Sequence, residues 1–439
     1  MLSAEQNERL TRVGPGTPGG EMLRRYWQPL AAAAELKEKS TKKVRLLGED
    51  LALFRDRAGN LGLVAELCPH RRCSLAYGVP ENEGIRCPYH GWLFDREGNC
   101  LEQPAEPEDS TFKDRVQTIA YPVREVGGIF WTYMGPGEPP VFPRHDYLVQ
   151  ENTLRDIGLT MLPINWVQAM ENSLDPTHLE WLHMWYGYYI RTGNSRTERG
   201  ELPQARHSKI GFDVTDYGIV KRRFYEGGSE EDHDWRIGHP VLFPNILKVG
   251  TSLQIRVIVD DTHTLHMLYG TYCYDGVEAP HQDVVPTYQI PYLNDDGTYD
   301  VRAVLQQDMM AWVTQGTIAD RTVEHLGTSD KGIILYRQVF EEQVRRVEAG
   351  EEPMFVYRDP DHAGRIDIPI DTVESAKVGV SRRSGPGEQR RGQLSWMDEP
   401  DPEKMLAQLE SVYNQSHWSP INRDIVKMRM EYLKARGVA

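Results

Sequence analysis

Cysteine is scarce in this chain: 439 residues contain five, at positions 68, 73, 87, 100 and 273. An odd number in a long chain argues against a disulfide framework and favours a reducing compartment, where thiols serve as ligands or simply pack. We expect Cys273 to be an ordinary strand residue, because a free cysteine behaves as a small apolar side chain. The other cysteines must be judged by their neighbours.

Long apolar runs and an excess of basic charge are also missing. No stretch approaches the roughly 20 apolar residues that a membrane span requires, and the polar start of the chain has no secretory pattern. Lys and Arg number 50 against 65 Asp and Glu, a net charge of -15. That balance argues against nucleic acid or an anionic membrane as the main partner, so we expect a cytoplasmic protein that binds neither.

The length predicts two domains, because a single core rarely grows beyond roughly 250 to 300 residues. Short strands with turns between them, such as 43–56 and 127–135, predict an all-β domain within 1–140. A Pro- and Gly-rich segment, 135–146, predicts the connection. The rest, 141–439, combines strand patterns at 209–225, 245–261 and 263–274 with helical patterns at 163–185, 301–316, 334–350 and 402–415. We therefore predict an α+β second domain with an antiparallel sheet.

Two short segments of the first domain each carry one cysteine and one histidine. Cys68 and His70 stand in CPH, Cys87 and His90 stand in CPYH, and 16 residues separate the two segments. Two thiolates and two imidazoles complete a four-ligand metal site. Structural zinc sites usually pair like ligands, as in Cys-x-x-Cys, whereas each arm of a Rieske [2Fe-2S] cluster gives sulfur to one iron and nitrogen to the other. The mixed arms favour the Rieske cluster, an electron relay.

The pattern, followed by GWLFD, resembles the ring-hydroxylating Rieske oxygenases, a non-haem iron family. The resemblance covers nearly the whole chain and is closest to the phthalate dioxygenase branch, which includes O-demethylating enzymes. The segment CPHRRC also resembles the cluster arm of respiratory-chain Rieske proteins, in which a second cysteine on each arm forms a disulfide. Here Tyr89 stands where the partner of Cys73 would be, so we expect Cys73 to be unpaired.

The resemblance implies a second metal site, a mononuclear Fe(II). The segment 171–183 matches the family pattern Glu-Asn-x-x-Asp-x-x-His-x-x-x-x-His and contains Asn172, Asp175, His178 and His183. The implied ligands are a facial triad of two histidines and one carboxylate, with His178 and His183 as the histidines. These two would sit roughly 140° apart on a straight α-helix. We therefore expect a break at Pro176 and a bulge or helix end at His183.

The third ligand has three candidates, Asp308, Asp320 and Glu324. We favour Asp308, seven residues before Gln315, because this segment is similar to the Glu-Asp-Lys segment in which the demethylase branch places its iron carboxylate. Gln307 and Met309 stand here in place of that glutamate and lysine.

The resemblance also implies how electrons reach the iron. Asp175 would accept a hydrogen bond from His178 and reach His90 of the partner subunit in a homotrimer. The chain has no nicotinamide or flavin fingerprint, so a separate reductase of flavin or ferredoxin type would supply the electrons and O2 would be the oxidant.

The implied substrates are aromatic carboxylates, such as phthalate, methoxybenzoates or aryl ethers, which would be hydroxylated or O-demethylated. Lys209, Arg206 and His207 are candidates for the cation that a carboxylate needs. A quaternary amine such as a betaine remains an alternative substrate, because an aromatic cage binds such cations and aromatic residues gather near His183, at positions 181, 185, 186, 188 and 189. A mere electron carrier or a zinc-stabilised binding protein is the third possibility, against which the second metal motif argues.

Overall fold

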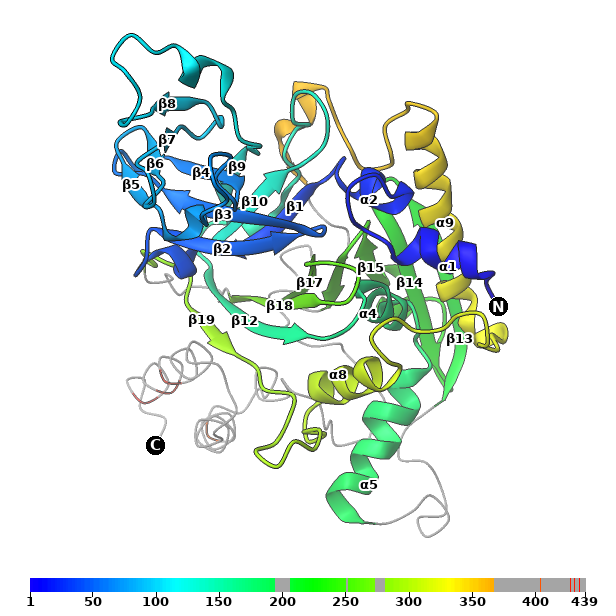
Figure 1. The fold of residues 1–439 in the computed structure, drawn as a ribbon. Coiled ribbons are helices and arrows are strands. Elements are labelled where there is room, and N and C mark those ends of the chain that lie inside the picture. Colours follow the sequence, from blue (N-terminus) through cyan, green and yellow to red (C-terminus); the bar gives the residue numbers. More distant parts are fainter. Residues whose placement is uncertain are drawn as a thin grey trace.

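The computed structural model describes residues 1–193, 206–249, 252–272 and 281–366, together with the isolated positions 403, 427, 430 and 434. Two sheet-containing regions lie side by side, one built from β1 to β10 and the other around the long strands β12 to β18 (Figure 1). Cys273 and, apart from position 403, the helix expected over 402–415 lie outside the described residues. None of the helices in the described part of the chain is long and apolar enough to cross a membrane.

The first region consists of three small antiparallel sheets, as the sequence predicts. In sheet order their strands are β1 (Trp27–Ala32), β10 (Ile129–Tyr133) and β9 (Val123–Val126); β2 (Thr41–Leu46), β3 (Glu49–Arg55) and β4 (Leu61–Ala65); and β5 (Val79–Glu81), β6 (Gly84–Arg86), β7 (Leu93–Phe94) and β8 (Cys100–Glu102). Three short 3-10 turns connect them: η1 (Ala33–Leu36), η2 (Leu75–Tyr77) and η3 (Phe112–Arg115). Phe54 and Phe94 pack against Cys68 and Cys87 in one buried cluster, so the two cysteines are fixed by the core of this region.

The second region is organised around one eight-stranded sheet. Its strands, in sheet order, are β13 (His207–Thr215), β14 (Gly218–Tyr225), β15 (His239–Leu242), β16 (Ile246–Val249), β17 (Ser252–Ile258), β18 (Thr264–Tyr272), β12 (Leu154–Leu162) and β19 (Thr287–Gln289). Neighbouring strands are antiparallel, as predicted, except that β19 joins the outer edge of β12 in the same direction. A separate parallel pair joins β11 (Arg144–His145) to β20 (Arg365–Ile366).

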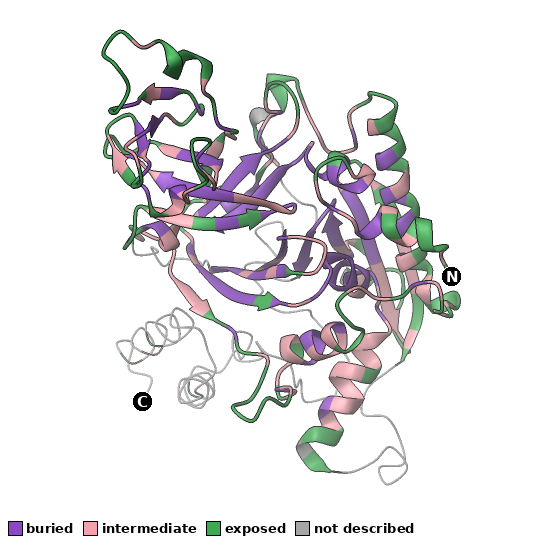
Figure 2. Cartoon of the chain, in the orientation of Figure 1, coloured by how far each residue is buried: buried purple, intermediate pink, exposed green. Residues whose placement is uncertain are grey.

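Helices cover this sheet and extend beyond it. They are α1 (Ala4–Thr11), α2 (Pro18–Leu23), α3 (Asp146–Val149), α4 (Trp166–Ser173), η4 (Leu179–Tyr186), α5 (Gly187–Thr192), α7 (His233–Arg236), α8 (Val304–Thr314), η5 (Thr328–Asp330), α9 (Lys331–Glu348) and η6 (Pro360–Ala363). The predicted helices at 163–185, 301–316 and 334–350 are therefore present. Burial concentrates along the sheets and the inner sides of the helices, whereas α5 is largely intermediate or exposed (Figure 2).

The N-terminal helices α1 and α2 pack against α9, a helix of the second region (Figure 1). The backbone of Leu2 donates to the carbonyl of Arg321 at 3.0 Å, and Arg9 pairs with Glu341 at 3.2 Å and Glu348 at 3.1 Å. The first residues of the chain thus complete the surface of its second half.

Buried charges tie α4 to α9. Glu171, near the end of α4, accepts hydrogen bonds from Arg321 at 2.8 Å and from Arg337 at 2.7 Å, and Arg337 also binds Glu324. Burial acts to raise the pKa of Glu171, but the two guanidinium groups outweigh it, and the pKa is lowered. This cluster fixes the end of α4, immediately before the segment that carries the second metal motif.

Candidate metal centres and their surroundings

The two cysteine arms of the first region have matching backbone turns. In one arm the N–H of Arg72 donates to the carbonyl of Cys68 at 2.9 Å, and in the other the N–H of Gly91 donates to Cys87 at 3.0 Å. Arg72 and Gly91 occupy the same position, four residues after each cysteine, and both have left-handed backbone, with φ of 62° and 77°. A glycine suits that conformation in the second arm. The similar turns bring the two arms together over one site.

The side chains of these arms divide into buried sulfur and accessible nitrogen. Cys68 and Cys87 are buried, with 1% and 3% of their surface exposed, whereas His70 is exposed and His90 partly so. The imidazole rings of His70 and His90 lie 4.5 Å apart between centroids. Burial raises the pKa of the Cys68 thiol to about 12, and the neighbouring Cys87 acts in the same direction. Two adjacent buried thiolates need a cationic group between them, so the donor set fits a [2Fe-2S] cluster.

Cys73 is free, as expected from Tyr89 in the opposite arm. The guanidinium of Arg71 lies 5.2 Å from the centre of the Tyr89 ring. The centres of the Tyr89 and His90 rings are 3.8 Å apart. Trp92 stacks on His70, with ring centres 4.4 Å apart and planes 7° from parallel. Aromatic packing thus orients both histidines.

The second motif begins where α4 ends. The helix stops at Ser173, the break falls at Asp175 and Pro176, and the following helix η4 is a π-helix that contains His183. The break and the bulge at His183 are both confirmed. A π-helix forms hydrogen bonds between residues i and i+5, and His178 and His183 have this same i, i+5 spacing. This winding places on one side two histidines that an α-helix would turn away from each other.

The carboxylate of Asp308, on α8, completes the group. His183 Nε2 lies 3.2 Å and His178 Nε2 lies 3.7 Å from Asp308 Oδ1, and one ligand atom from each residue falls within 4.8 Å of the others. Asn172 Nδ2 approaches the same oxygen at 3.4 Å. Two imidazole nitrogens and one carboxylate oxygen that face a common point form the facial triad of a mononuclear iron site.

The other two carboxylate candidates lie elsewhere. Asp320 is exposed and accepts hydrogen bonds from Thr322. Glu324 is held by Arg337, whose Nη2 donates to it at 2.9 Å. Among Asp308, Asp320 and Glu324, the structure therefore brings only Asp308 to the histidines.

Asp175 uses its two carboxylate oxygens differently. Oδ1 accepts from the backbone N–H of Thr177 at 2.7 Å, and Oδ2 lies 3.6 Å from His178 Nδ1, slightly beyond hydrogen-bond distance. Burial acts to raise the pKa of Asp175, but His178 and the Thr177 N–H outweigh it and the pKa is lowered. Asp175 is thus an ionised carboxylate that both caps a turn and faces a proposed iron ligand.

Gln307 holds the other histidine. Its Oε1 lies 3.0 Å from His183 Nδ1, while its own Nε2 donates to the carbonyl of Val301 at 2.9 Å. The amide oxygen must accept, so Nδ1 of His183 carries the proton and Nε2 is left free to bind a metal. In the sequence, Gln307 departs from the family pattern, which has a glutamate there. Its position next to Asp308 was the available signal for its contact with His183.

The three expected substrate cations occupy different environments. Lys209 is 49% exposed and pairs with Glu230, and Arg206 is exposed. His207 is half-buried, with 6% of its side chain exposed, and its Nδ1 contacts Glu180 of η4. Lys221, a buried lysine of β14, was not among the predicted substrate cations. The signal in the sequence was a lysine that directly follows apolar strand residues in GIVKRRFY.

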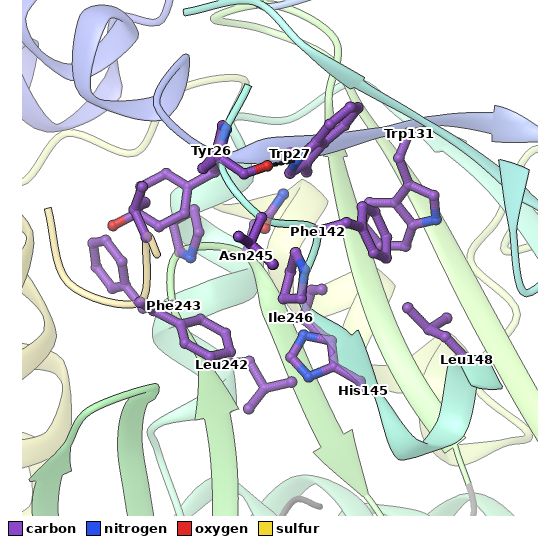
Figure 3. Close-up of a pocket in the computed structure, with 16 residues that line it drawn as sticks. Tyr26, Trp27, Trp131, Phe142, His145, Leu148, Leu242, Phe243, Asn245 and Ile246 are labelled. Atoms are coloured by element: carbon purple, nitrogen blue, oxygen red, sulfur yellow. Dashed lines mark hydrogen bonds between the residues drawn. The ribbon is translucent and has the colours of Figure 1, made fainter. Parts of the chain in front are cut away.

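A small cavity of about 30 Å³ lies at the junction between the two regions (Figure 3). Its walls are mainly aromatic and apolar, with Trp27, Trp131 and Phe142 among them, and the buried His145 reaches into it. Burial lowers the pKa of His145 to about 4. The volume suits one or two waters, and none of the lining residues belongs to the His178, His183 and Asp308 group.

Comparisons with known proteins cover both halves of the chain. Residues 26–120 match the family model of the Rieske [2Fe-2S] domain, and residues 292–364 match a model described as LigXa C-terminal domain like. The chain is 42% identical to the 5,5'-dehydrodivanillate O-demethylase oxygenase subunit of Sphingobium sp., over 86% of this chain and 88% of that protein. It is 32% identical to the phthalate 4,5-dioxygenase oxygenase subunit of Pseudomonas putida, over 80% and 88%.

Among solved structures, NdmA of Pseudomonas putida shares the fold, with a TM-score of 0.55 at 17% identity over 76% of this chain and 94% of that chain. The chain belongs to the Rieske non-haem iron ring-hydroxylating oxygenases, in the phthalate dioxygenase-like branch that includes O-demethylases. It is an oxygenase component whose cofactors are a Rieske [2Fe-2S] cluster and a mononuclear iron, and it needs a reductase or ferredoxin as electron donor.

Proposed function

We propose that this protein is the terminal oxygenase that O-demethylates or hydroxylates an aromatic carboxylate, with methoxylated benzoates as the first substrates to try. One observation carries the proposal: Asp308, His178 and His183 converge within 4.8 Å, in a chain 42% identical to an O-demethylase oxygenase subunit.

In this proposal Cys68, His70, Cys87 and His90 hold the cluster, and His178, His183 and Asp308 hold the iron. The iron, when bound, supplies oxygen activation with electrons relayed from the cluster. The protein orients these ligands: Gln307 keeps Nδ1 of His183 protonated, and Asp175 faces Nδ1 of His178.

The overall reaction balances with two electrons. O-demethylation of a methoxybenzoate consumes one O2, two electrons and two protons, and it yields the phenol, formaldehyde and water. Dihydroxylation of the ring consumes the same reagents and yields a cis-dihydrodiol. Both reactions use the same ligands, so the products distinguish them.

We also propose that residues 1–140 and 141–439 are the two domains and that the working unit is a homotrimer. The trimer would place Asp175 beside His90 of the partner subunit and give the electrons a short path. The exposed position of the cluster histidines supports such an arrangement, since a buried pair could not be reached from a neighbour.

A quaternary amine is less well supported as the substrate. The aromatic side chains near His183 pair along the outer part of η4 and α5, as in Trp181 with Trp185 and Tyr186 with Tyr189. Trp181 is 40% and Tyr189 is 43% exposed, whereas a cage for a cation needs enclosed ring faces.

Turnover of a substrate panel tests the proposal. The protein, loaded with cluster and iron, would be incubated with a supplied reductase and NADH in the presence of methoxybenzoates, phthalate, phenoxybenzoate and a betaine. We expect consumption of an aromatic acid with stoichiometric formaldehyde or a diol, identified by product mass. Oxidation of the betaine alone, or of no aromatic acid, would contradict the proposal.

A further inference from the structure

The sheet face next to the proposed iron site carries a buried cation that the metal chemistry does not use. Lys221 lies in β14, opposite His239 of β15, and only 6% of its surface is exposed. Its charge acts on Asp175, on His183 and on Asp308. The ammonium group is therefore within electrostatic range of the iron ligands from the side of the sheet.

Its neighbours on this face are cationic groups that have partners. Arg223, two residues along β14 and so on the same face, lies 3.5 Å from Asp234. His239 lies 3.7 Å from the same carboxylate, and His207 contacts Glu180. Lys221, by contrast, makes no ion pair within 4.0 Å and no side-chain hydrogen bond to any residue that the structure describes.

A buried ammonium group without a partner at ion-pair distance is costly, and proteins rarely keep one without a role. Burial and the nearby Arg223 lower the pKa of Lys221 to about 7, although Asp175 and Asp308 act to raise it. The two aspartates already face the histidines of the iron site. No carboxylate of the described residues lies at ion-pair distance from Lys221, which leaves its ammonium group open to an added anion.

We propose that Lys221 is the residue that recognises the carboxylate of the substrate and so fixes which end of an aromatic acid faces the iron. One or more of its N–H groups would donate to the carboxylate oxygens, a charge-assisted contact in a dry site. Arg223, held by Asp234, would support the positive potential without binding the substrate itself. This inference rests on the proposed function, in that it takes the ligand to be an aromatic acid.

Equilibrium binding of a matched pair of probes tests the role of Lys221. The probes are 3-methoxybenzoate and its methyl ester, which differ in charge and little in shape, and binding is measured by dialysis against the loaded protein. The variants are Lys221→Met, which keeps the length of the side chain, and Lys221→Arg, which keeps the charge. Lys43→Met is the matched control, because Lys43 lies on β2 of the first region, where it is exposed and paired with Glu66.

We expect Lys221→Met to weaken binding of the acid by about tenfold to a hundredfold, the usual effect of losing a hydrogen bond to a charged group. Binding of the ester should change little, Lys221→Arg should keep a preference for the acid, and Lys43→Met should behave as wild type. Iron content, measured for each variant, should remain that of wild type.

Three results would overturn the inference: wild-type protein that binds acid and ester equally, a Lys221→Met variant with unchanged affinity for the acid, or equal losses for both probes. Equal losses together with loss of iron would mean that Lys221 only balances the charge of Asp308. The proposed function fails separately, if wild-type protein binds the acid tightly but yields no product from any aromatic acid.

Discussion

At the scale of single residues, Asp175 has two roles that one substitution can separate. Its Oδ1 caps the turn after Pro176, and its Oδ2 faces His178. Asn caps a turn about as well as Asp, but an amide has no negative charge and adds a donor. The cap survives the change to Asn, whereas the proposed link from His178 through Asp175 to His90 of the partner subunit should not.

Asp175→Asn should therefore give a folded protein that holds both metals, with a cluster that still reduces normally. Reoxidation of the cluster in the presence of substrate and O2 should be much slower than in wild type, and little product should form. Single-turnover kinetics, followed by the visible spectrum of the cluster, measure this rate. A wild-type rate would leave Asp175 as a cap only.

Gln307 offers a second test at this scale. Gln307→Leu keeps the volume of the side chain but removes the oxygen that accepts from His183 Nδ1. We expect iron affinity to fall by about tenfold to a hundredfold, as is typical when the outer hydrogen-bond partner of a metal-binding histidine is lost. Competition with a chelator measures the loss, while the cluster spectrum should stay unchanged.

Gln306→Leu is the control for this experiment, because the side chain of Gln306 donates to the carbonyl of Pro291 at 3.5 Å and, among the described residues, to no other group. Gln307→Glu, which keeps an acceptor oxygen, should restore much of the affinity. If Gln307→Leu held iron as tightly as Gln306→Leu, the orientation of His183 would have to come from helix winding alone.

At the scale of elements, the buried charge cluster between α4 and α9 determines how firmly the metal-binding segment is held. Glu171→Gln leaves Arg321 and Arg337 without their shared counter-charge. Removing one partner of a buried pair typically costs about 3 to 5 kcal/mol. We expect a loss of this size in the free energy of unfolding at pH 7, measured by urea denaturation. Glu341→Gln, in a partly exposed surface pair with Arg9, should cost less than about 1 kcal/mol.

The same cluster predicts a dependence on pH with a defined sign. The pKa of Glu171 is lowered in the folded protein, so its contribution is fully present above the ordinary glutamate pKa of about 4.3. That contribution is lost as pH falls through the lower folded value. The difference in stability between wild type and Glu171→Gln should therefore shrink below about pH 4. A constant difference down to pH 3 would contradict the role of an ionised Glu171.

Most of these elements could be predicted from the sequence, because the patterns that make them are local. Alternating apolar residues predicted β13 and β14, and Pro176 predicted the break after α4. The sequence also required a bulge at His183, because two ligands five residues apart cannot share a side of an α-helix. It could not indicate that the whole of η4 adopts π winding, since this depends on packing between η4 and α8.

Contacts between distant segments were harder to predict. Nothing local shows that Lys221 of β14 approaches Asp308 of α8, or that Glu180 meets His207. Such pairs follow from the register of β13, β14 and β15, which is fixed by the whole sheet. The sequence favoured Asp308 among three carboxylates only through a family resemblance, and its contact with the histidines depends on the packing of α8 against η4.

At the scale of the whole molecule, the proposed trimer predicts complementation between damaged subunits. His70→Ala should spoil the cluster, and Asp308→Ala should remove the iron, so each variant alone should be inactive. Mixed trimers should regain activity, because the cluster of one subunit serves the iron of the next. In a head-to-tail ring each mixed trimer keeps one intact cluster-to-iron route out of three, so the purified mixed species should regain about a third of wild-type turnover.

Co-expression with two different affinity tags and sequential purification would yield the mixed species. Separately purified and then combined homotrimers provide the control, and they should stay inactive unless subunits exchange. Inactive mixed trimers that retain the intact cluster of one variant and the intact iron site of the other would point to electron transfer within each chain.

The packing of α1 and α2 against α9 has a consequence for how the protein is made. Ribosomes deliver α1 first, and α9 follows about 320 residues later, which takes roughly 16 to 64 s at common elongation rates. During that interval the Rieske region can fold, while Leu10, Met22 and Leu23, buried in the finished protein, have no α9 to cover them. The nascent chain therefore leaves these apolar residues without their α9 partner until residue 348 has been synthesised. Slow-translating hosts or low temperature should aggravate aggregation, and co-expressed chaperones that hold early segments should raise the yield of intact oxygenase.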